Sequence, residues 1–99
     1  MTLFTVYFLD KQDSLAVRQQ YLGVHIAWLD QHKERILVGG SLRHQPGDAA
    51  LGGLWIVEAE SKAEIEELIL TDPFWINGLR ASVEILYWSK AFPERQSLV

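Results

Sequence analysis

An almost unbroken apolar run at the start of the chain limits the folds that this sequence can adopt. Residues Thr2 to Leu9 read TLFTVYFL, which is rich in β-branched and aromatic side chains. Such a run is typical of a β-strand that is covered on both faces. It is far short of the ~18 apolar residues that a membrane span needs, and it lacks the basic segment and cleavage site of a signal peptide. We therefore expect a buried first strand in a cytoplasmic protein with no membrane partner.

The rest of the chain reads as two helices and three further strands. Asp13 and Ser14 can cap a helix that runs to about Glu34, and Ser61 to Glu64 form a capping box for a second helix. Thr71-Asp72-Pro73 ends that helix and can start a short further turn. The expected strands cover residues 36–42, 54–58 and 81–88. This order of elements is that of ferredoxin-like folds, so the sequence predicts an α+β fold, a βαββαβ unit with a four-stranded antiparallel sheet.

Length, charge and cysteine content exclude several classes of function. Residues 1–99 suffice for a single domain, with residues 90–99 as a C-terminal tail, and leave no room for a separate cofactor domain. The formal net charge of −4 opposes binding to phosphate backbones, so we expect no nucleic-acid partner. The chain contains no cysteine, which rules out disulfides, a thiolate nucleophile and cysteine-ligated metal sites.

The first and last strands carry large apolar side chains on both faces, whereas two helices can cover only one face of the sheet. We expect one face to hold Val6, Phe8, Val83 and Ile85, and the other to hold Phe4, Tyr7, Leu86 and Trp88. A bare second face would be an apolar patch larger than monomers usually expose. The sequence therefore predicts a homodimer in which two sheets pack face to face and form a dimeric α+β barrel.

The first helix carries the most informative polar side chain, His25. This residue lies about 60° from Leu22 on the helical wheel, and Arg18 lies on the same side. We expect both at the edge of a buried stripe formed by Leu15, Leu22, Ile26 and Leu29. A histidine in that place could act as a general acid or base, because its ordinary pKa lies near physiological pH. The simpler alternative is a histidine that only bonds a backbone carbonyl.

Asp72 is the second candidate for a chemical role. A carboxylate can orient an imidazole and stabilise its protonated form. An aspartate directly before Pro73 is also a good helix N-cap with no catalytic role. Among further candidates, Ser41 and Arg43 could hold a substrate carboxylate or phenolate, and Trp75 could form the wall of an aromatic pocket. Arg43 could equally be an ordinary loop charge, and Trp75 a part of the core.

Metal ions and nucleotide cofactors are not expected. His25 and His32 are seven residues apart, or ~10.5 Å along a helix, which is too far to share one ion. The pairs Gly39-Gly40 and Gly52-Gly53 lie in or beside expected strands and lack the spacing of dinucleotide-binding or phosphate-binding loops. The sequence thus predicts that the protein uses no metal and no cofactor.

Several of these motifs together resemble the YciI-like (YCII-related) family. They are Gly-Val-His-Ile-Ala-Trp-Leu around His25, Ile-Leu-Val-Gly-Gly up to Gly40, and Asp72-Pro73-Phe74 followed by Gly78-Leu79. The resemblance extends from the first strand to about Trp88. It implies a dimeric α+β barrel of ferredoxin-like subunits, each with a pocket in which a histidine and an aspartate act together, and these roles would fall on His25 and Asp72.

The resemblance also implies kinship with cofactor-independent isomerases and dehalogenating lyases of aromatic degradation. The chain departs from the family pattern at Leu22, where an arginine is often found, and at Gly40-Ser41, where a proline often follows the glycine. Arg18 could take the place of the arginine that is missing at Leu22 and bind the substrate. Two hypotheses follow: a cofactor-independent enzyme that acts on a small cyclic or aromatic anionic substrate, and a non-catalytic dimer that binds a metabolite or another protein.

Overall fold

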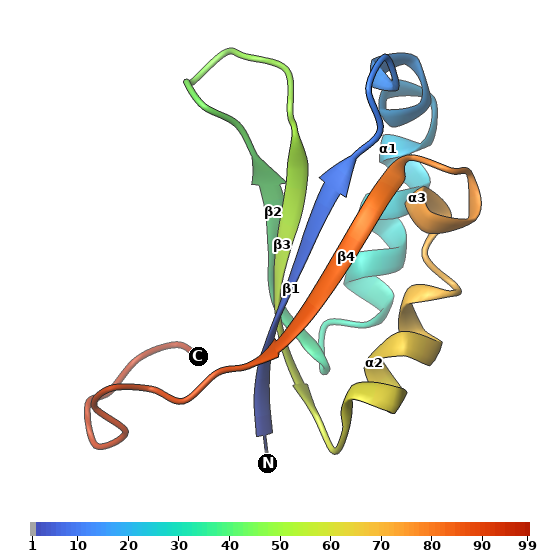
Figure 1. Ribbon diagram of the computed structural model, residues 1–99. Coiled ribbons are helices and arrows are strands. Elements are labelled where there is room, and N and C mark those ends of the chain that lie inside the picture. The colour runs from blue at the N-terminus through green and yellow to red at the C-terminus, as the bar shows by residue number, and fades with distance from the viewer. Residues whose placement is uncertain (1) are drawn as a thin grey trace.

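The computed structural model describes residues 2–99 and contains the elements in the expected order. They are β1 (Thr2–Asp10), α1 (Leu15–Gln31), β2 (Ile36–Leu42), β3 (Gly52–Ala59), α2 (Lys62–Ile69), α3 (Pro73–Ile76) and β4 (Arg80–Tyr87). The strands form one antiparallel sheet in the order β2-β3-β1-β4. Figure 1 shows the helices together on one side of this sheet. The predicted ferredoxin-like βαββαβ fold is confirmed, and the short turn expected at Pro73 is helix α3.

Helix α1 ends at Gln31, three residues earlier than expected. The chain makes a tight turn over the next residues, in which the backbone N–H groups of Arg35 and Ile36 both donate to the carbonyl of His32. This turn brings Ile36, a buried residue at the start of β2, into the core.

The core lies between the helices and one face of the sheet. Phe4, Val6 and Phe8 of β1 all lie in it, so the expectation that Phe4 faces away from the other two was wrong. Residues two apart in a strand point to the same side, and this period puts all three on the helical face. The other large members of the core are Trp28, Trp55, Val57, Ile65, Leu68 and Ile69.

Helix α1 buries a different stripe from the one expected. Its buried residues are Arg18, His25 and Trp28, whereas Leu22 and Ile26 are 43% and 55% exposed. Trp28 explains the rotation, because its indole packs 5.4 Å from that of Trp55 and its Nε1 donates to Thr71 Oγ1 over 3.1 Å. The wheel of apolar residues could not anticipate this, since it assigned the charged and polar side chains to the outside.

The second face of the sheet carries apolar side chains and no helix among the described residues (Figure 1). Strand alternation places Tyr7, Val38, Ile56, Leu86 and Trp88 there, and Leu86 is 47% exposed. The bare face predicted from the sequence is therefore present in the single chain. Beyond β4, the tail runs away from the sheet on this uncovered side (Figure 1). Over residues 2–99, no helix is both long and apolar enough to cross a membrane.

Candidate functional site

The turn between α2 and α3 fixes a buried carboxylate. Asp72 is fully buried, and its Oδ1 accepts a 3.0 Å hydrogen bond from the backbone N–H of Phe74. Pro73 occupies the first position of α3, where its missing N–H costs nothing. Asp72 is thus the helix cap that the Asp-Pro pair suggested. Its second oxygen, Oδ2, is buried without a partner among residues 2–99.

The same aspartate also holds His25. The imidazole Nδ1 lies 2.7 Å from Asp72 Oδ1, and only 5% of His25 is exposed. An ionised carboxylate can only accept, so beside a neutral imidazole Asp72 would accept from Nδ1–H and leave Nε2 as an acceptor. No described residue bonds Nε2, and His25 lines a pocket. The two roles considered for Asp72, helix cap and histidine partner, are therefore carried by one oxygen atom.

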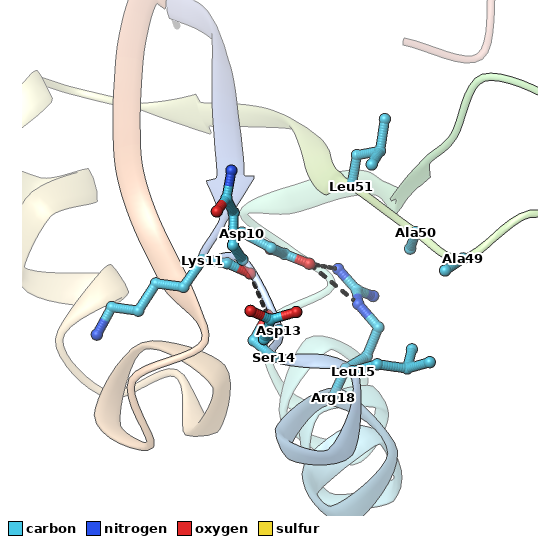
Figure 2. Close-up of a pocket in the computed structure, with 10 residues that line it drawn as sticks. Asp10, Lys11, Asp13, Ser14, Leu15, Arg18, Ala49, Ala50 and Leu51 are labelled. Carbon is cyan, nitrogen blue, oxygen red and sulfur yellow. Dashed lines mark hydrogen bonds and ion pairs between the residues drawn. The ribbon is translucent and has the colours of Figure 1, made fainter.

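A second buried cluster joins the end of β1 to the start of β4. Asp10 Oδ2 accepts from Arg18 Nη2 at 2.6 Å and from Nε at 3.1 Å, and Asp10 Oδ1 accepts from Arg80 Nη1 at 2.7 Å. Figure 2 shows Arg18 extending from α1 to Asp10 across a depression lined by Ala49, Ala50 and Leu51. Burial lowers the pKa of Arg80 from its ordinary value, because desolvation of the guanidinium outweighs its bond to Asp10. We name these three residues the Arg-Asp-Arg cluster.

The His25-Asp72 pair and the Arg-Asp-Arg cluster meet at one pocket of about 270 Å³ between α1, β2 and the β2–β3 loop. Its polar lining is Arg18, His25, Ser41, Arg43, Asp48 and Arg80. Leu22 and Ile26, the exposed apolar residues of α1, form part of its wall. A cavity of this kind, mainly apolar with a few convergent polar groups, is the usual form of a small-molecule site.

The structure brings four of the expected site residues to this pocket, namely Arg18, His25, Ser41 and Arg43, with Asp72 directly behind His25. Arg43 is exposed, and its guanidinium donates to Ser41 Oγ and to the carbonyl of Asp48. Trp75 lies elsewhere, in a shallow depression with Ile69 and Val83 against the core. The substrate-binding roles assigned to these side chains stay predictions.

Sequence reasoning missed Asp10 and Arg80. Both lie at strand ends, where charged side chains are ordinarily exposed. The signal was available in the topology, because antiparallel pairing of the first and last strands brings residue 10 opposite residue 80. Among residues 2–99, no three histidine or acidic side chains lie close enough to hold a metal ion.

The model of the YCII-related domain matches residues 2–89, most of the chain. This chain belongs to the YCII-related family. The new member is similar to the solved 5-chloro-2-hydroxyhydroquinone dehydrochlorinase, TftG, of Burkholderia phenoliruptrix, a structure determined with 2,5-dihydroxybenzoquinone. The identity is 34%, the match covers 88% of this chain and 93% of that one, and the TM-score is 0.80.

More distant structures share the fold of this YCII-related protein. An antibiotic biosynthesis monooxygenase of Bacteroides thetaiotaomicron is 14% identical over 97% of this chain and 94% of that chain, with a TM-score of 0.54. A dimeric ferredoxin-like protein from an uncultured marine organism is 10% identical over 90% and 94%, with a TM-score of 0.51. No curated protein matches the sequence.

Proposed function

We propose that this YCII-related protein is a cofactor-independent enzyme, a lyase or isomerase, that acts on a small cyclic or aromatic anionic substrate. The observation that carries the proposal is the buried bond between His25 Nδ1 and Asp72 Oδ1. This bond makes Nε2 the proton acceptor at the pocket. A general base in that position accelerates proton transfer by about 10² to 10⁴-fold.

In the proposed reaction a single residue, His25, accepts and releases the proton. His25 Nε2 removes a proton from the substrate, and the carboxylate of Asp72 stabilises the imidazolium that forms. In an elimination, the ring reacts as its keto form, in which the carbon that bears the leaving group has gained a proton. Loss of a hydroxyl proton to Nε2 then forms a carbonyl, the electron pair expels a leaving group such as chloride from that saturated carbon, and the imidazolium gives its proton to solvent. In an isomerisation, the imidazolium returns the proton to another atom of the same substrate.

The relationship to TftG supports a substrate of this class. That enzyme is named for the removal of chlorine from a chlorinated hydroxyhydroquinone, and its ligand in the crystal is a small quinone. The pocket described here has a compatible character, with apolar side chains from α1 on one side and arginines on another. Chloride elimination from a hydroxylated ring is therefore the first reaction to test.

We also propose that the protein forms a homodimer through the uncovered face of its sheet. That face exposes Tyr7, Val38, Leu86 and Trp88, which a second copy could cover by packing sheet against sheet. An antiparallel sheet with both faces apolar requires a cover on each side. One structure with the same fold is described as a dimeric ferredoxin-like protein.

The decisive experiment measures chloride release from 5-chloro-2-hydroxyhydroquinone by ion chromatography. We expect the wild type to release chloride, and His25→Ala to be at least about 10²-fold slower while it retains a native circular dichroism spectrum. Full activity in His25→Ala would refute proton transfer by this residue. A wild type that binds 2,5-dihydroxybenzoquinone but converts neither 5-chloro-2-hydroxyhydroquinone nor related rings would favour the non-catalytic binding protein.

A further inference from the structure

Two buried arginines share a single carboxylate at the pocket. Arg18 and Arg80 are 9% and 7% exposed, and both bind Asp10. Asp72, whose charge also acts on Arg80, is committed to His25 and to the N-terminus of α3. Burial of an uncompensated charge is destabilising. The Arg-Asp-Arg cluster therefore has one positive charge more than its own acids neutralise, which favours a bound anion.

The two arginines use their hydrogen-bond donors differently. Arg18 makes two bonds to Asp10 Oδ2 and a third, of 3.3 Å, to the carbonyl of Gly52. Arg80 makes one bond, from Nη1 to Asp10 Oδ1, and its Nε is buried without a partner among the described residues. Its Nη2 also donates to no described residue. Arg18 is thus held by the protein, whereas Arg80 lines the pocket with its Nη2 unbonded.

The surroundings of Arg80 hold its guanidinium in a narrow space. A Cβ atom at Gly53 would lie 3.2 Å from Nη2 and 3.4 Å from Nη1, tighter than most side chains allow. The guanidinium carbon lies 4.5 Å from the ring centroid of Phe8 and 5.1 Å from that of Phe74. The two aromatic rings and the missing side chain at Gly53 together fix the plane of the guanidinium.

We infer that Arg80 binds an anionic oxygen, carboxylate or phenolate, on the ring of the substrate, while Asp10 and Arg18 position its guanidinium. The inference rests on the proposed function and assigns the binding residue for the substrate's charge. Phe74 connects this subsite to the proton carrier, because His25 stacks on the same ring that Arg80 contacts. A ring held by its oxygen at Arg80 would thereby present another edge to Nε2.

A planar guanidinium suits this ligand better than an ammonium would. Its Nη2, together with the second N–H of Nη1, can donate to a carboxylate or to adjacent oxygens of a hydroxylated ring, and it binds weakly to the uncharged form of the same ring. Burial strengthens the interaction, since water competes little at a side chain of such low exposure. Arg80 would therefore select anionic over neutral rings of equal size.

The test compares the binding of two rings by isothermal titration calorimetry, without turnover. 2,5-Dihydroxybenzoquinone is a vinylogous acid and is ionised at neutral pH, whereas 2,5-dimethoxybenzoquinone is neutral. We expect the wild type to prefer the anion at least tenfold. Arg80→Gln should weaken binding of the anion by about 10 to 100-fold and leave binding of the neutral ring within about twofold. Arg35→Gln is the matched control, because it removes the same charge from an exposed side chain paired with Glu64.

Arg80→Lys keeps a positive charge beside Asp10 and serves if Arg80→Gln does not fold. We expect its preference for the anion to fall several-fold, since an ammonium lacks the second parallel donor. Equal binding of the two rings by the wild type, no binding of the anion, or an unchanged preference in the folded Arg80 variants would overturn the inference. Failure of the proposed function is read separately, from chloride release by the wild type and His25→Ala.

Discussion

The imidazole of His25 stacks on the ring of Phe74, with centroids 3.9 Å apart and planes inclined by 15°. Phe74 follows Asp72 by two residues, so the short Asp-Pro-Phe turn contacts the imidazole both at its edge and on its face. Contact on both sides leaves the ring little freedom to rotate. A proton acceptor whose orientation is fixed before the substrate arrives is what general base catalysis requires.

Replacement of Asp72 should separate its two roles. Asp72→Ala removes both the cap of α3 and the partner of His25, and we expect a loss of about 1 to 3 kcal/mol in the free energy of unfolding along with activity. Asp72→Asn retains an oxygen for the N–H groups of Phe74 and His25 but loses the negative charge that stabilises the imidazolium. It should lose about 10²-fold or more in chloride release and less stability than Asp72→Ala. Full activity in Asp72→Asn, by the same assay, would contradict the pairing.

The Arg-Asp-Arg cluster predicts a large effect at Asp10. Asp10→Ala leaves two buried guanidinium groups without their carboxylate, and we expect a loss of about 3 to 5 kcal/mol in urea unfolding. Asp30→Ala removes the same charge from an exposed position of α1 and should change stability by less than about 0.5 kcal/mol. Equal stability of the two variants would mean that the cluster contributes nothing to folding.

Replacement by alanine should affect stability very differently at two glycines, Gly52 in a central strand and Gly40 in an edge strand. A Cβ at Gly52 would lie 2.0 Å from the carbonyl oxygen of Phe8, so the backbone of β1 or β3 must move. We expect Gly52→Ala to cost about 3 kcal/mol or more, or to abolish soluble expression. At Gly40 no atom lies within 4 Å of the added carbon. Gly40→Ala should unfold within about 0.5 kcal/mol of the wild type in urea, and a similar loss in both variants would disprove the steric explanation.

The uncovered sheet face predicts the oligomeric state. Size-exclusion chromatography with light scattering should give twice the 11.3 kDa mass of the chain. Leu86→Lys places a charge on the uncovered face and should shift the protein towards the monomer at micromolar concentration. Ile76→Lys, on the exposed side of α3, is the matched control and should remain dimeric. A wild type that elutes as a folded monomer would exclude the face-to-face dimer.

The order of elements and the bare sheet face were predictable because both depend on local apolar pattern. The side of α1 that packs on the sheet was not, since it depends on contacts between distant residues. Trp28 packs against Trp55 of β3, and Arg18 and His25 are buried because Asp10 and Asp72 meet them. A helical wheel counts each residue alone and cannot include such partners.

His25 and Asp72 were identifiable from the resemblance, whereas Arg80 was not. Its side chain matters only because antiparallel pairing brings it opposite Asp10 and because Gly53 leaves it space. Both conditions arise from β-strand register, which a single sequence specifies only once the topology is known.

The apolar wall formed by Leu22 and Ile26 has a consequence for how this protein could diversify. These side chains face the pocket and are largely exposed in the single chain, so the core does not depend on their size or shape. Mutations there could therefore reshape substrate preference at little thermodynamic cost. Related proteins could then evolve to accept rings with different substituents while His25 and Asp72 beneath stay unchanged.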